Sequence, residues 1–168
     1  SAFYIYNQHL NYSNICINGC AFCAFGKPEG HPDGFRLSVA EAVEKVAERR
    51  DEPIRELHIV GGLDPGLPFS YYVELIGELK RVRPRAHIKA FTAVEIAHMA
   101  DISQSSTREV LAELKAAGLG SLPGGGAEVF SPRVRKKLCP KKLSAEGWLR
   151  VHREAHELGL STNATILY

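Results

Sequence analysis

The strongest constraint on the fold is a regular alternation of short apolar segments with longer segments of helical character. Strands are predicted over 9–15, 55–60, 86–91, 119–122 and 160–168, and helices over 39–50, 69–82, 106–117 and 144–158. Strands separated by helices of about 10–15 residues predict right-handed βαβ units and therefore a parallel sheet. Five such strands can form an open doubly wound sheet or an incomplete barrel. In both architectures the ligand site lies at the carboxyl ends of the strands.

Four polar or glycine-rich segments follow the predicted strands. They are the cysteine-bearing loop 16–34, Gly61-Gly62, Thr92–Glu95 and Gly124–Glu128. Because the carboxyl ends of parallel strands meet at one edge of a sheet, we expect these segments to converge on one site.

Cys16, Cys20 and Cys23 form a C-x3-C-x2-C motif. Iron–sulfur clusters are held by cysteine thiolates, usually four of them for a [4Fe–4S] cube. Three ligands on one loop therefore predict a cluster with one iron open to another chelator. Gly19, between the first two ligands, suits a tight loop because glycine tolerates positive φ. The alternatives are zinc, which usually needs a fourth ligand such as His31, and a chance grouping of reduced cysteines.

Composition limits the remaining function classes. The chain has 168 residues, 45% of them hydrophobic, which suits one domain with a sizeable core or a piece of a larger domain. A net charge of +2 with dispersed basic residues, apart from Arg133–Lys142, argues against a nucleic-acid partner. There is no apolar run of about 18 residues and no signal pattern, so we expect no membrane span and a cytoplasmic location. Because the chain lacks an initial Met and stops at Tyr168 inside a predicted strand, we expect a fragment.

The cysteine motif, with the aromatic Phe22 directly before the last cysteine, resembles the signature of the radical S-adenosylmethionine (SAM) superfamily. The resemblance implies that the amine and carboxylate of SAM chelate the open iron and that Phe22 lies near the adenine. The alternative for Phe22 is a core aromatic. A fourth ligand would prevent SAM from binding, so Cys139 is interpreted as a structural cysteine, with a free surface thiol as the alternative.

Other strand-end residues become cofactor candidates by the same resemblance. Gly61 and Gly62 precede Leu63, which replaces an acid common in the superfamily, and the alternative is a simple turn. Gly124 and Gly125 could bring backbone N–H groups to a sugar or anion, or they could simply form a flexible loop. Glu128 would accept from ribose hydroxyls, or it could be a solvated acid at a helix start.

Three further polar residues lie on or after the third predicted strand. Thr92 and Glu95 could contact SAM or substrate, with Glu95 as a catalytic candidate, or they could form an N-cap pair. Lys89, on the strand itself, is the other catalytic candidate because a cation would suit a carboxylate substrate.

Longer phrases resemble one branch of the superfamily. Lys89-Ala90-Phe91-Thr92-Ala93-Val94-Glu95 and Leu122-Pro123-Gly124-Gly125-Gly126-Ala127-Glu128 are similar to aminodeoxyfutalosine synthases of menaquinone biosynthesis. Dehypoxanthine futalosine cyclase and the tyrosine-using subunit of deazaflavin (F420-precursor) synthase share much of the pattern. Asp64 departs from it, because the family's Gly-Gly-Leu-His-Pro has His at that position.

The resemblance implies a partial (β/α)6 barrel, with residues 1–168 as the N-terminal and central part of a radical SAM core domain. It implies a transferase that adds the 5′-deoxyadenosyl radical to the enol-ether double bond of 3-[(1-carboxyvinyl)oxy]benzoate. The cofactors would be a [4Fe–4S] cluster and SAM, with an electron donor such as flavodoxin or ferredoxin. A non-catalytic ferredoxin and a zinc-binding module are the alternatives of another class.

Overall fold

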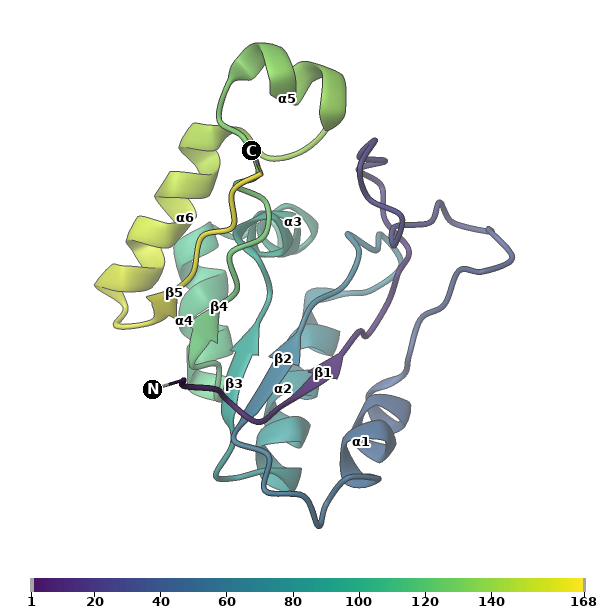
Figure 1. Ribbon diagram of the computed structural model, residues 1–168, viewed down its shortest axis with the longest axis vertical. Helices are drawn as coiled ribbons and strands as arrows, with labels where there is room; N and C mark the ends of the chain where they lie inside the picture. The colour runs from purple at the N-terminus through teal and green to yellow at the C-terminus, as the bar shows by residue number, and fades with distance from the viewer. Residues whose placement is uncertain (1, 168) are drawn as a thin grey trace.

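The computed structural model describes residues 2–167 and contains one five-stranded parallel sheet. The strands are β1 (Asn7–Leu10), β2 (Glu56–Ile59), β3 (His87–Ala90), β4 (Ser121–Leu122) and β5 (Ser161–Thr162). Their order in the sheet is their order in the chain (Figure 1). This arrangement confirms the predicted parallel α/β architecture.

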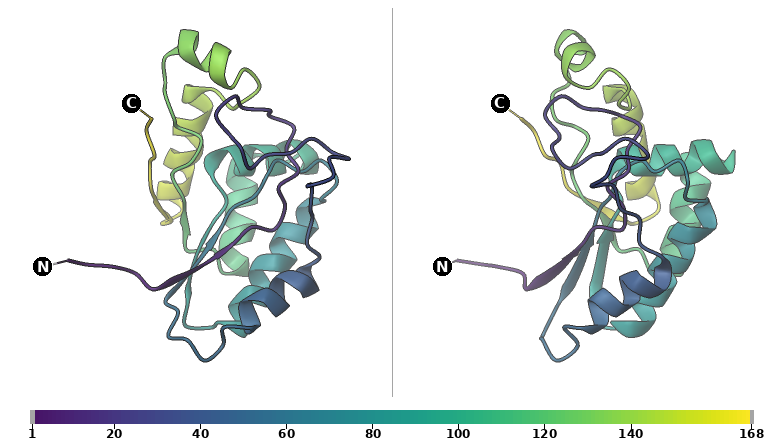
Figure 2. Two further views of the ribbon diagram at one scale, coloured as in Figure 1. Left: turned by 45° about the vertical axis from the view of Figure 1, so that its right-hand side comes forward. Right: turned by 90° about the vertical axis from the view of Figure 1, so that its right-hand side faces the viewer.

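Six helices accompany the strands in the described residues. They are α1 (Val39–Ala47), α2 (Phe69–Val82), α3 (Ala93–Ser103), α4 (Thr107–Ala117), α5 (Pro132–Leu138) and α6 (Ala145–Glu157). Four of them, α1, α2, α4 and α6, cover one face of the sheet, and the other face is left open (Figure 2). None of the helices in this part of the chain is long and apolar enough to cross a bilayer.

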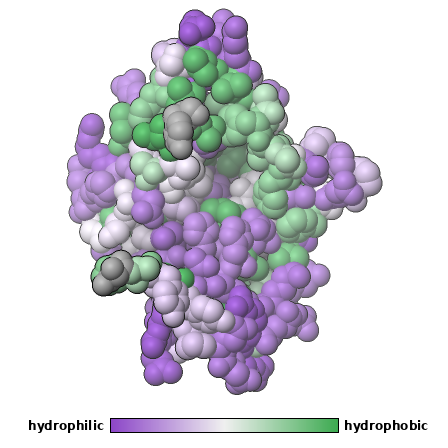
Figure 3. All heavy atoms as spheres, viewed as in Figure 1, coloured by the Kyte–Doolittle hydropathy of each residue, from purple (hydrophilic) through white to green (hydrophobic). Residues whose placement is uncertain are grey.

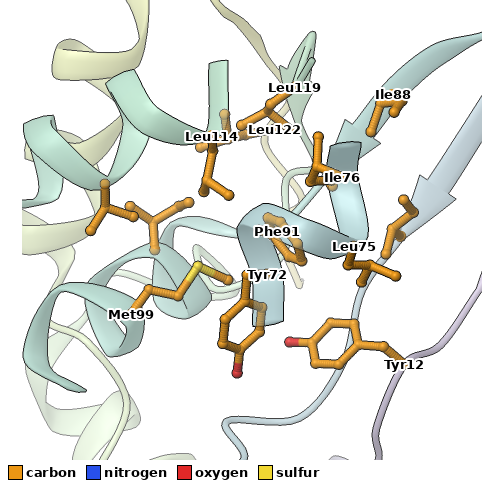
Figure 4. Close-up of a cluster of buried hydrophobic side chains, with 14 of the residues drawn as sticks. Tyr12, Tyr72, Leu75, Ile76, Ile88, Phe91, Met99, Leu114, Leu119 and Leu122 are labelled. Atoms are coloured by element: carbon orange, nitrogen blue, oxygen red, sulfur yellow. The ribbon is translucent and has the colours of Figure 1, made fainter. Parts of the chain in front are cut away.

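The hydrophobic core lies between the sheet and the helices. Strand residues such as Leu57, Ile59 and Ile88 are fully buried there, and α2 contributes Leu75 and Ile76 (Figure 4). The alternation of strand side chains leaves the other face polar, because residues i and i+2 point to the same side. Figure 3 shows hydrophilic residues over the middle of that open face and hydrophobic ones gathered beyond them, toward the C-terminal segment.

All five strands are shorter than the sequence predicts, and the first and last differ most from their predicted ranges. The first ends at Leu10, because Ser13 instead pairs with Arg36 at the base of the cysteine loop. The last covers only Ser161–Thr162, not 160–168. After it, irregular extended chain still contacts the segment after β4, with Thr165 N donating to Gly124 O at 3.0 Å. The predicted end at Tyr168 lies outside the described residues.

Two helices were not predicted. Helix α3 is apolar around most of its circumference and is buried at most positions, so it lacks the one-sided periodicity that marks a surface helix. Helix α5 has only seven residues and is mostly basic. Apart from the N-cap alternative at Thr92 and Glu95, neither segment carries a helical signal strong enough to be recognised from sequence alone.

His152 provides a test of the packing between α6 and the rest of the fold. Its ring stacks on Trp148 with centroids 3.6 Å apart, and its buried Nε2 has no hydrogen-bond partner within residues 2–167. Burial, with a smaller contribution from the neighbouring His156, lowers the pKa of His152 from 6.5 to about 4. Between those pH values the unfolded chain binds more protons than the folded one, so stability should fall as the pH drops from 6.5 to 4.

The expected contribution of this one residue is roughly 1–3 kcal/mol. His152→Leu should flatten the dependence of the urea midpoint on pH over that range, compared with the parent chain. His156→Gln, at the exposed end of α6, is the control and should leave most of the slope in place. An unchanged slope in the His152→Leu protein would contradict the assignment.

Candidate functional site

The cysteine loop is fixed to the sheet at its beginning. Cys16 N donates to Lys27 O at 2.8 Å, and Ile17 N donates to Leu63 O at 3.2 Å, just beyond the end of β2. Lys27 N in turn donates to Asn14 O at 2.8 Å. The loop therefore starts at the carboxyl ends of β1 and β2, where a parallel α/β fold is expected to bind its ligand.

The space beside Gly26 is bordered by Cys16 and Cys23, and Cys20 lies between these two cysteines in the sequence. Cys16 and Cys20 are partly buried and Cys23 is exposed. A Cβ placed on Gly26 would lie 3.7 Å from Cys23 Sγ and 3.9 Å from Cys16 Sγ, so the glycine keeps this space clear. Gly26 N donates to Cys23 Sγ at 3.4 Å, the kind of contact that tunes cluster sulfurs. Burial raises the pKa of the Cys20 thiol, and the charge of Lys142 acts in the opposite direction.

This donor set fits an iron–sulfur cluster better than a single metal ion. In residues 2–167 no three His, Cys, Asp or Glu side chains converge as ligands of one ion. A cube bound at three corners does not need such convergence, because each thiolate binds a different iron. His31, the possible zinc ligand, uses its Nδ1 to accept from Asp33 N at 3.1 Å within its own loop.

Asp64 joins the two ends of the cysteine loop. Its carboxylate is fully buried and accepts from Ser13 Oγ at 2.7 Å, before the loop, and from Arg36 Nε at 2.8 Å, after it. Arg36 Nη2 pairs with the second oxygen, so the contact is bidentate, and Gly66 N also donates to it at 2.9 Å. Bidentate Arg–carboxylate pairs fix orientation as well as charge. The position where the related family has His is thus occupied by a loop-closing acid.

Gly61 and Gly62 are required by the packing of the protein itself. A side chain on Gly61 would overlap the ring of Tyr12, and one on Gly62 would overlap the Ile15 carbonyl. Gly62 N donates to Ser13 O at 2.8 Å, which holds the end of β2 against the start of the cysteine loop. The two glycines therefore allow the backbone of β2 to approach the predicted cluster site closely.

Glu95 is buried at the same strand ends, and its carboxylate accepts hydrogen bonds from three residues. One of its carboxylate oxygens accepts from Tyr12 OH at 2.9 Å and Gly61 N at 3.0 Å, and the other accepts from Thr92 N and Thr92 Oγ1, both at 2.7 Å. Of the two interpretations of Thr92 and Glu95, the structure shows the N-cap pair, as a capping box that starts α3. Burial raises the pKa of Glu95, and the hydrogen bonds from Thr92, Tyr12 and Gly61 oppose that rise.

The glycine-rich segment after β4 packs against the backbone that follows β5 and against Thr92. A Cβ on Gly124 would come within 2.7 Å of the Ala164 backbone, and one on Gly125 within 3.0 Å of Thr92 Cγ2. Glu128 has a positive φ of 49° and is not at a helix start, so that alternative was wrong. Its carboxylate accepts from Gly126 N and from Lys142 Nζ, each at 3.0 Å.

Lys142 connects this segment to the cysteine loop. Its Nζ pairs with Glu128 and lies 5.1 Å from the centre of the Phe22 ring, within the range of a cation–π contact. Phe22 is 40% exposed, so it is not a core aromatic. Cys139 is 1% exposed, which agrees with the prediction of a structural cysteine and excludes a surface thiol.

Lys89 lies on the open face of the sheet, with His9 and His58 at matching positions on β1 and β2. Its Nζ pairs with the buried Glu56 carboxylate at 3.0 Å, so its charge is already partly balanced. His9 and His58 stack with their rings 5.2 Å apart. Burial lowers the pKa of His58, and His9 and Lys89 lower it further.

The structure thus brings the cysteine loop, Gly61-Gly62, the Thr92–Glu95 box and the Gly124–Glu128 segment together, as predicted. Sequence reasoning missed Tyr12, the Asp64–Arg36 pair and Lys142. The signals for the last two were the unexpected acid at position 64 and the basic run that contains Lys142.

Comparisons with known proteins identify the family of the chain. The model of the radical SAM superfamily matches residues 10–168. The chain is 46% identical over 166 residues to aminodeoxyfutalosine synthase from Thermus thermophilus, covering 99% of this chain and 45% of the relative. It is 42% identical over 165 residues to 5-amino-6-(D-ribitylamino)uracil--L-tyrosine 4-hydroxyphenyl transferase from Methanopyrus kandleri, covering 98% of this chain and 45% of the relative.

A solved structure gives the same fold. The FeFe-hydrogenase maturase HydG from Carboxydothermus hydrogenoformans superposes with a TM-score of 0.71 at 22% identity, over 96% of this chain and 36% of that one. The chain therefore spans less than half the length of each of these relatives. A family match over residues 10–168, together with a relative that is 46% identical over 99% of this chain, establishes that the chain belongs to the radical SAM superfamily.

Proposed function

We propose that Cys16, Cys20 and Cys23 bind the [4Fe–4S] cluster of a radical SAM enzyme and that the surrounding strand ends bind SAM. The observation that carries this proposal is the placement of all three thiols on one loop at the carboxyl ends of β1 and β2. In this superfamily the cluster and SAM together supply a 5′-deoxyadenosyl radical. The residues of this chain position those groups and limit access of water to them.

The roles of the remaining site residues follow from their contacts. Phe22, exposed directly before Cys23, is available to the adenine. Gly61, Gly62, Gly124 and Gly125 let neighbouring segments pack closely at the strand ends, and we infer that their backbone groups contact SAM there. Glu128 is available to the ribose through the carboxylate oxygen that neither Gly126 nor Lys142 engages. We assign Thr92 and Glu95 to positioning, since each oxygen of Glu95 already accepts two hydrogen bonds.

For the reaction, we infer that the whole protein adds the 5′-deoxyadenosyl group to the enol-ether double bond of 3-[(1-carboxyvinyl)oxy]benzoate, forming aminodeoxyfutalosine. The 46% identity to the Thermus thermophilus synthase supports this choice. Lys89, with an exposed edge on the open sheet face, would contribute to binding a carboxylate of this substrate. Residues 1–168 would be the N-terminal and central part of the barrel that encloses it.

The 42% identity to the Methanopyrus kandleri transferase favours a second candidate, a reaction of tyrosine with a ribitylaminouracil. Product analysis of the whole protein with each substrate separates the two. A SAM-derived adenosyl adduct of the enol ether is expected. Turnover of tyrosine with 5-amino-6-(D-ribitylamino)uracil alone would instead select the second candidate.

The cofactor proposal has its own test in anaerobic reconstitution with iron and sulfide. We expect about four irons per chain and, after dithionite reduction, an electron paramagnetic resonance signal that changes shape when SAM is added. The change is expected because three protein thiolates leave one iron open to SAM. A cluster signal indifferent to SAM in the whole protein, or the absence of iron uptake, would contradict the proposal.

A further inference from the structure

The segment 131–142, which contains α5, has an unusual charge. It carries six basic residues and no acid, although the whole chain has a net charge of only +2. Every other helix in the described residues contains at least one Asp or Glu. The positive charge of this protein is therefore concentrated in one short segment, and the remainder of the chain is net negative.

Two of the six cations have structural roles within the fold. Arg135 is buried and donates to several backbone carbonyls, including Ala127 O at 2.7 Å, and Lys142 pairs with Glu128. The other four are exposed and form no ion pair with any described residue; they are Arg133, Lys136, Lys137 and Lys141. Exposed like charges that have no partner within the fold create a positive field at the surface, which attracts an acidic partner.

This basic patch, defined as Arg133, Lys136, Lys137 and Lys141, adjoins the cysteine loop. Ala21 N, between two of the cysteines, donates to Leu138 O at the end of α5 at 2.8 Å. Lys142 reaches the Phe22 ring, and Cys23 beside it is exposed. Figure 2 shows α5 at the same end of the molecule as the cysteine loop, far from α1. Whatever docks on the patch lies close to the outer edge of the proposed cluster.

We propose that the basic patch on α5 is the docking surface for an acidic electron-carrier protein that delivers one electron at a time to the cluster. The inference rests on the proposed function. One electron leaves the reduced carrier and arrives at the cluster, and no bond is made or broken. Complementary charge steers the encounter and raises its rate, most strongly at low ionic strength. The proximity to Cys23 favours an electron carrier over a nucleic acid, which would gain nothing from that position.

The test compares two charge-reversal variants of the whole, reconstituted protein. Lys136→Glu combined with Lys137→Glu alters the patch, while Lys45→Glu combined with Arg50→Glu makes the same change in charge at α1. Reduction of the cluster by a photoreduced flavodoxin is followed anaerobically by stopped-flow absorbance. At low salt we expect the patch variant to be reduced about tenfold more slowly than the parent and the control to stay within about twofold. High salt should remove most of the difference, because exposed charges are screened.

Dithionite, a small reductant that needs no docking surface, separates this proposal from the underlying one. The parent and both variants should give the same dithionite-reduced signal and the same response to SAM. If the parent protein gives no cluster signal, or a signal that does not respond to SAM, the proposed function itself is contradicted. Equal flavodoxin rates for the patch and control variants would overturn the docking proposal. If the reduction rates with flavodoxin were equal and the patch variant had lost RNA binding, the surface would be assigned to nucleic acid. That result would also overturn the docking proposal.

Discussion

Replacing Cys20 with serine should reduce the iron content of the reconstituted protein from about four per chain to near zero, whereas Cys139→Ser should keep the cluster. A neutral serine hydroxyl is a poor substitute for a thiolate, and Cys20 is one of only three proposed ligands. Cys139 is the matched control, because it is the remaining cysteine of the chain and is more deeply buried than the other three. Iron and sulfide analysis, together with electron paramagnetic resonance after reduction, measures the outcome.

The same pair of variants decides between an open and a closed cluster. If Cys139 were a fourth ligand, its replacement would remove the cluster as effectively as that of Cys20, and the interpretation as a ferredoxin-like module would gain support. Circular dichroism of both variants checks that any loss of iron does not result from unfolding. Cluster retention in the Cys20→Ser protein would contradict the three-ligand assignment.

The architecture was predictable because its signals are local. Serine N-caps followed three residues later by Glu, as at Ser38 and Ser106, mark helix starts, and the structure shows both capping boxes. Short β-branched runs between such helices imply parallel pairing and hence the convergence of strand ends. The same logic placed the cysteine loop and the glycine-rich segments at one edge of the sheet.

The parts that sequence reasoning missed depend on contacts between distant residues. Asp64 is recognisable as unusual, but its role becomes visible only when Arg36 and Ser13 are seen on either side of it. Lys142 belongs to a basic run whose members look alike in sequence. Only the fold shows that Lys142 is turned toward Glu128 and Phe22 while Lys136 and Lys137 remain exposed. No local pattern contains this information.

Glu95→Ala should lower the free energy of unfolding by about 3–5 kcal/mol, because it removes the acceptor of several buried hydrogen bonds. The Tyr12 hydroxyl and the Gly61 N–H would lose a partner where water has little access, since Glu95 is 2% exposed. Glu109→Ala is a matched control, because Glu109 closes the same kind of capping box with Ser106 at the exposed start of α4. We expect that variant to lose no more than about 1 kcal/mol. Urea unfolding followed by circular dichroism measures both.

A milder variant keeps this prediction testable if Glu95→Ala does not fold. Tyr12→Phe removes a single donor to Glu95 and should cost about 1 kcal/mol. Tyr12 lies just before the cysteine loop and Gly61 lies just after β2. Weakening the Glu95 contacts should therefore also broaden the SAM-dependent change in the resonance signal before stability is lost. If Glu95→Ala were as stable as Glu109→Ala and yet lost the response to SAM, Glu95 would act by direct contact with the cofactor. We predict a large loss of stability in Glu95→Ala and only a small loss in Tyr12→Phe. This combination would identify Glu95 as the residue that holds the two strand ends in register for cofactor binding.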